Sequence, residues 1–192
     1  MPTPPVGGPN PFLDATAGRM LELAAARFSD RQAIVAADRC ISYAEFLAEA
    51  ERVARGLLAL GIAKDDKVAL WLPNRPAWLF VQYGCAMIGA VLVALNTRYK
   101  AHELAYILAQ SDATTLILAD HLGPVDFLET LGEVLPDLRE GEPGELDSGQ
   151  LIGHSSADGF RRQKSPISVL GVCQVAFPPA YLGATQGGVT IG

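Results

Sequence analysis

The chain has 192 residues, a formal net charge of −6, and a hydrophobic content of 49%. Its length and hydrophobicity suit one folded domain with a sizeable core, and they exclude a wholly disordered chain. The charge argues against nucleic-acid binding, because no surplus of Lys and Arg is present to neutralise phosphates. Glycine is unevenly distributed, since ten of the 19 glycines follow residue 138.

Cysteine usage and the first residues bear on the cellular compartment. Cys40, Cys85 and Cys173 are widely spaced, odd in number, and form no CxxC pair. This pattern argues against a disulfide framework or a zinc site, and it predicts reduced thiols in the cytoplasm. No charge precedes Asp14, so the N-terminus lacks the basic region of a signal peptide.

The first predicted elements lie between residues 12 and 61. Apolar periodicity and short β-branched runs predict, in order, a helix Leu13–Phe28, strands Gln32–Ala37 and Arg39–Ser42, and a second helix. Asp14 is the predicted N-cap of the first helix. Ser42 and Glu45 have capping-box spacing, so the second helix begins there, and Gly61 supplies the left-handed residue that ends it.

Strands and helices alternate along the next part of the chain. The predicted elements are strand Lys67–Leu72, helix Pro76–Gly89, strand Ala90–Leu95, helix Lys100–Gln110, strand Thr114–Ala119 and helix Pro124–Leu135. The continuous apolar run Ala90–Leu95 is typical of a strand buried on both faces. This alternation predicts an α/β fold with a mostly parallel sheet and flanking helices.

Two uncharged stretches raise the question of a membrane span. Residues 76–97 carry no charge over the length of a spanning helix. Gly84 and Gly89, together with the alternating pattern on both sides, favour a buried helix, a turn and a buried strand. Ser165–Gly192 is also uncharged, but Pro178 and Pro179 would break a helix there. We expect no transmembrane span.

The sequence divides into three regions. Residues 1–11 hold five of the 13 prolines and are expected to form a flexible leader. Residues 12–138 carry the α/β pattern. Residues 139–192 show no sustained period and are expected to form an irregular, poorly ordered tail.

The search for catalytic chemistry is negative. The sequence contains no dinucleotide fingerprint, phosphate loop, nucleophile elbow or HExxH helix. His102 is expected to be an exposed side chain of a helix, His121 to lie beside Asp120 in a loop by chance, and His154 to lie in the tail. Thr185–Gly188 is glycine-rich but no lysine follows to meet a phosphate. We therefore assign no catalytic, cofactor-binding or metal-binding residue.

Four segments in a fixed order carry a family resemblance. They are Ile41–Phe46 (ISYAEF), Gly61–Ile62 with Asp66–Asn74 (DKVALWLPN), Gly89–Asn96 (GAVLVALN) and Glu103–Leu108 (ELAYIL). Together they closely resemble the N-terminal region of the AMP-forming acyl-CoA synthetases of the acyl-adenylating superfamily, from Phe12 to Leu138. One departure is Asp65, because the family usually has glycine before the aspartate matched by Asp66.

The resemblance implies an activity that needs more than this segment. Full-length members join a carboxylic or fatty acid to ATP with Mg²⁺, and coenzyme A then displaces AMP to form a thioester. The family's phosphate loop, Thr-Glu pair, ribose-binding aspartate and C-terminal lysine match no position here, so no catalytic residue carries over. The resemblance implies an inactive N-terminal fragment that needs no cofactor alone. A shifted reading frame, a misplaced gene end or true divergence would each explain the tail.

Two other hypotheses stay open. The first is a non-catalytic α/β module that binds a synthetase or another partner. The second is a small α/β nucleotide-binding protein. Because a buried strand needs covering layers, we also expect marginal stability and self-association through exposed apolar surface.

Overall fold

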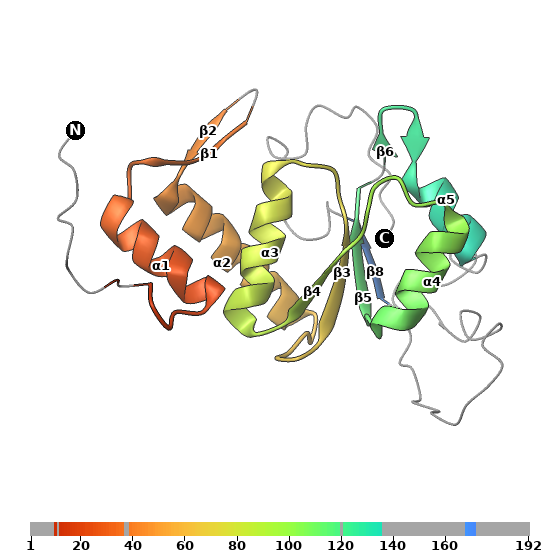
Figure 1. The fold of residues 1–192 in the computed structure, drawn as a ribbon, viewed down its shortest axis with the longest axis horizontal. Coiled ribbons are helices and arrows are strands. Elements are labelled where there is room, and N and C mark those ends of the chain that lie inside the picture. Colours follow the sequence, from red (N-terminus) through yellow and green to blue (C-terminus); the bar gives the residue numbers. More distant parts are fainter. Residues whose placement is uncertain (1–9, 11, 37–38, 120, 136–167, 172–192) are drawn as a thin grey trace.

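A parallel sheet lies at the centre of the molecule (Figure 1). The computed structural model describes residues 10, 12–36, 39–119, 121–135 and 168–171. In spatial order the strands are β4 (Val91–Ala94), β3 (Lys67–Trp71), β5 (Thr115–Leu118) and β8 (Ser168–Gly171). All three neighbouring pairs are parallel. The predicted parallel sheet is therefore confirmed.

Helices cover both faces of this sheet. On one side lie α1 (Ala17–Phe28), α2 (Tyr43–Ala59) and α3 (Pro76–Ile88). On the other lie α4 (Ala101–Ser111) and α5 (Phe127–Val134) (Figure 1). The helix α3 connects β3 to β4, and α4 connects β4 to β5. These crossovers produce the layered α/β architecture that the alternating pattern predicts.

Two antiparallel hairpins flank the layers. The first pairs β1 (Gln32–Val35) with β2 (Cys40–Ser42), close to the two predicted strands. The second pairs β6 (His121–Leu122) with β7 (Val125–Asp126) around Gly123, which has φ 57°. The sequence pattern does not predict this second hairpin, because strands of two residues are too short to show a period.

The starts of two helices differ from prediction. The first helix begins at Ala17 rather than Leu13, and the Thr16 hydroxyl caps it by accepting from the Arg19 N–H at 3.3 Å. Asp14 is not the cap, because its φ of 67° is left-handed rather than extended. Similarly, α5 begins at Phe127, after the hairpin, rather than at Pro124.

The capping predictions for α2 are confirmed. At the start of α2 the Ser42 N–H donates to the Glu45 carboxylate at 2.7 Å, and the Glu45 N–H donates to the Ser42 hydroxyl at 3.2 Å. Gly61 follows α2 with φ 82°, and Gly89 ends α3 with φ 75°. Glycine tolerates this left-handed conformation without a Cβ clash.

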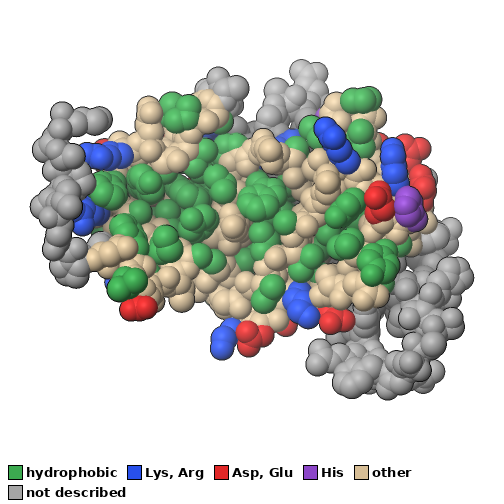
Figure 2. Space-filling view, in the orientation of Figure 1, with side chains coloured by type: hydrophobic (Ala, Val, Ile, Leu, Met, Phe, Trp, Pro, Cys, Tyr) green, Lys and Arg blue, Asp and Glu red, His purple; other side chains and the backbone are tan. Residues whose placement is uncertain are grey.

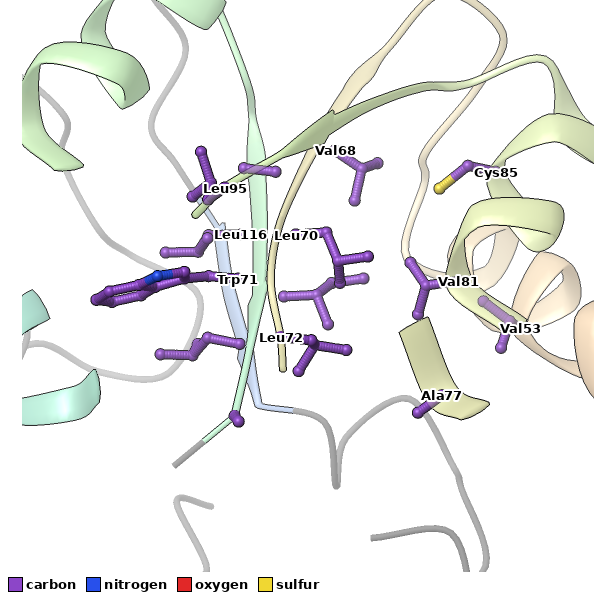
Figure 3. Close-up of a cluster of buried hydrophobic side chains, with 14 of the residues drawn as sticks. Val53, Val68, Leu70, Trp71, Leu72, Ala77, Val81, Cys85, Leu95 and Leu116 are labelled. Atoms are coloured by element: carbon purple, nitrogen blue, oxygen red, sulfur yellow. The ribbon is translucent and has the colours of Figure 1, made fainter. Parts of the chain in front are cut away.

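The core forms around β3, whose side chains alternate between the two helical layers (Figure 3). Val68, Leu70 and Leu72 point toward α3, and Trp71 points to the opposite face. There the Trp71 ring lies 4.5 Å, centroid to centroid, from that of Phe127 in α5. The central strand thus joins both layers.

The strand β4 is not buried on both faces as its apolar run predicts. It lies at the edge of the described sheet, with Val91 45% exposed and Ala94 also exposed. Only the flanking Ala90 and Leu95 are buried. A run of apolar residues reports which side chains are available for packing. It does not report how many neighbouring strands pair with the backbone.

Within the predicted tail, the structure describes only the four residues of β8. They continue the sheet beside β5, from Thr115 opposite Ser168 to Leu118 opposite Gly171. Four residues are too few for a period to be visible in the sequence. The rest of the predicted tail and nearly all of the predicted leader lie outside the described residues.

Candidate functional site

Polar residues follow the carboxyl ends of β3 and β4, where α/β proteins commonly bind ligands. Asn96 follows β4, but its side-chain oxygen accepts from the Arg98 N–H at 3.0 Å. The Asn96 carbonyl oxygen accepts from Trp71 Nε1 at 3.1 Å. The two Asn96 oxygens therefore serve the turn and the core.

An ion pair lies at the other end of the strands, near their amino ends. Lys67 Nζ, at the start of β3, lies 3.3 Å from Asp112 Oδ2, at the end of α4. Asp112 itself adopts a left-handed φ of 54°. Both side chains are about one-third exposed, so the pair stabilises the contact between α4 and the sheet only modestly.

The residue that departs from the family pattern lies in a left-handed turn. Asp65 has φ 70°, and its N–H donates to the Gly89 carbonyl at 3.0 Å. Asp is among the residues that tolerate this conformation best after glycine. The departure therefore leaves the turn in place, and Asp66 still caps it by accepting from the Ala63 N–H at 2.8 Å.

The histidines do not gather into a site within the described part of the chain. His102 is exposed on the first turn of α4, as predicted. His121 is exposed but begins β6, rather than lying in a loop. Asp120, His154 and Thr185–Gly188 lie outside the described residues. Among the residues that are described, no three His, Cys, Asp or Glu side chains lie close enough to hold a metal ion.

The two described cysteines have different surroundings. Burial raises the pKa of the Cys85 thiol in α3 to about 12. Cys40 is exposed on β2. A thiol with a raised pKa is a poor nucleophile, so Cys85 is a core residue rather than a reactive one. Cys173 lies outside the described residues.

An uncharged surface covers α3 and β4. We define this apolar face by Leu79, Gln82 and Ala86, which lie on the side of α3 away from Gly84 and α2, together with Val91–Ala94 of β4. Figure 2 shows hydrophobic side chains over this part of the molecule and charged side chains around it. The signal for this surface in the sequence is the uncharged stretch 76–97.

The same stretch does not form a membrane span. It folds as α3, a turn at Gly89, and β4. Across the described ranges, no helix combines the length and the apolar character needed to cross a bilayer.

Comparison with known families identifies the class of protein that this fold represents. The family model for AMP-binding enzymes matches residues 21–164, about three quarters of the chain. The chain therefore belongs to the AMP-binding enzyme family. The match extends past Leu138, where the resemblance of the sequence segments ends.

Individual relatives narrow the comparison to acyl-CoA synthetases. The chain is 44% identical over 139 residues to the Bacillus subtilis (strain 168) protein named "Putative acyl-CoA synthetase YngI", covering 71% of this chain and 25% of the relative. It is 32% identical over 157 residues to the mitochondrial medium-chain acyl-CoA ligase ACSF2 of Macaca fascicularis, covering 77% and 25%. The chain thus spans about a quarter of the length of the curated relatives it matches.

A solved structure supports the fold. The o-succinylbenzoate coenzyme A synthetase MenE of Bacillus subtilis, in complex with ATP and a magnesium ion, matches with a TM-score of 0.59. The match covers 84% of this chain and 34% of that one at 19% identity. At this identity the likeness concerns the α/β architecture alone.

Proposed function

We propose that this chain forms the N-terminal part of an AMP-dependent acyl-CoA synthetase that acts on a carboxylic or fatty acid. The observation that carries the proposal is the 44% identity over 139 residues to a relative named as an acyl-CoA synthetase. The whole enzyme would form an acyl-adenylate from ATP and the acid. It would then transfer the acyl group to the thiol of coenzyme A, with release of AMP.

Within that enzyme the proposed role of the described residues is structural. Their most extensive feature is the core around β3, and the two oxygens of Asn96, after β4, are engaged in local hydrogen bonds. Stabilising phosphate and carboxylate charge in a transition state needs aligned backbone donors and cations. The four family motifs that would supply them match no position in this sequence. We therefore propose that the chain alone is inactive.

The substrates of the proposed reaction are ATP, Mg²⁺ and coenzyme A. We assign none of them to a residue of this chain. We also propose that the chain works in fatty-acid metabolism in the cytoplasm. Support for that compartment comes from cysteine usage, since Cys85 is a buried free thiol and the three cysteines are widely spaced.

A second candidate function is a non-catalytic module that binds a synthetase or another partner. The apolar face favours it, because an uncharged surface over α3 and β4 is suited to association with protein.

An assay of AMP release tests both candidate functions, because each of them predicts that the chain alone does not catalyse the reaction. The chain alone would be incubated with ATP, Mg²⁺, coenzyme A and fatty acids of several lengths. The proposal predicts no release above that of the heat-denatured chain. Turnover that depends on both the acid and coenzyme A would contradict the inactive fragment and the non-catalytic module together.

A further inference from the structure

We draw no further inference here: the strongest candidate, the surface patch at the end of α1 where the Arg27 and Arg31 guanidinium carbons lie 5.6 Å and 5.2 Å from the centroid of the Phe28 ring, carries nothing, because nothing in the described part of the chain shows what covers it.

Discussion

Gly84 shows how one residue sets the distance between two helices. A Cβ at this position would lie 2.7 Å from Val53 Cγ1, closer than real Cβ atoms approach, and 3.1 Å from the Ala50 carbonyl oxygen, which is a tight contact. Gly56, in the last turn of α2, has no atom within 4 Å of the same added Cβ. The two glycines therefore differ in packing while both lie within helices.

Substituting each glycine by alanine should change stability in opposite directions. Gly84→Ala should destabilise the chain by about 1–3 kcal/mol through overpacking. This cost is larger than the stabilisation expected from the higher helix propensity of alanine. Gly56→Ala should stabilise it by about 0.5–1 kcal/mol, because alanine loses less backbone entropy. Urea unfolding of both variants and the wild type gives the three free energies of unfolding and so their order of stability. A Gly84→Ala chain more stable than the wild type would contradict the close packing of α2 and α3.

The described cysteines should differ in reactivity. Burial raises the pKa of Cys85 to about 12, whereas Cys40 is exposed. Iodoacetamide at neutral pH should label Cys40 in the folded chain and label Cys85 only after denaturation, as read from peptide masses. Because the pKa of Cys85 is raised by folding, its contribution to stability is present below the unfolded value near 9.0 and is lost as pH rises toward 12. Rapid labelling of Cys85 in the folded chain would argue against its burial.

At the scale of elements, α2 is defined at its start by the capping box. The Ser42 N–H, and then the Ser42 hydroxyl, donate to the Glu45 carboxylate and lower its pKa below 4.5. The unfolded chain therefore takes up a proton at this site at a higher pH than the folded chain does. The contribution of Glu45 to stability is present above the unfolded pKa and is lost as pH falls through the folded one.

Comparing the wild type with Glu45→Gln over a range of pH tests this sign. The wild type should have the higher melting temperature near pH 7. The difference should shrink as the pH falls from about 5 to about 3, because the carboxylate then becomes protonated. A Ser42→Thr variant, which keeps a capping hydroxyl, should follow the wild type. A difference between wild type and Glu45→Gln that stays constant with pH would contradict the assigned carboxylate acceptor.

The elements also show what local patterns can predict. The cap of α2 and the left-handed Gly61 were predictable because their determinants lie within a few residues. The true cap of α1 was not, because Asp14 and Thr16 are both acceptable N-caps. The choice between them depends on where Leu21 and Ala25 are buried in the core.

The position of β4 depends on residues far from it in sequence. Its apolar run predicts a strand, and the structure confirms that strand. Whether a strand has a partner on one side or on both depends on segments that are distant in sequence. The pairing of β8 with β5 is an example. For the candidate site, the sequence predicts the absence of catalytic motifs and the uncharged stretch 76–97. It does not predict that the outer side of α3 and the edge of β4 form one surface.

At the scale of the whole molecule, the described residues combine a substantial core with a sheet whose outer strand, β4, is partly exposed. Both faces of the central sheet carry helices, and β3 and β5 are almost fully buried. Family membership, together with coverage of about a quarter of the relatives' length, gives this combination an explanation. We propose that the chain is a scaffold portion of a larger acyl-CoA synthetase.

The release of AMP by the purified 192-residue chain tests this account most directly. The assay supplies ATP, Mg²⁺, coenzyme A and a panel of carboxylic acids, with a full-length medium-chain acyl-CoA ligase as the positive control. The account predicts release no faster than from the heat-denatured chain, at every acid tested. Release that requires both an acid and coenzyme A, and that co-purifies with the chain, would contradict it.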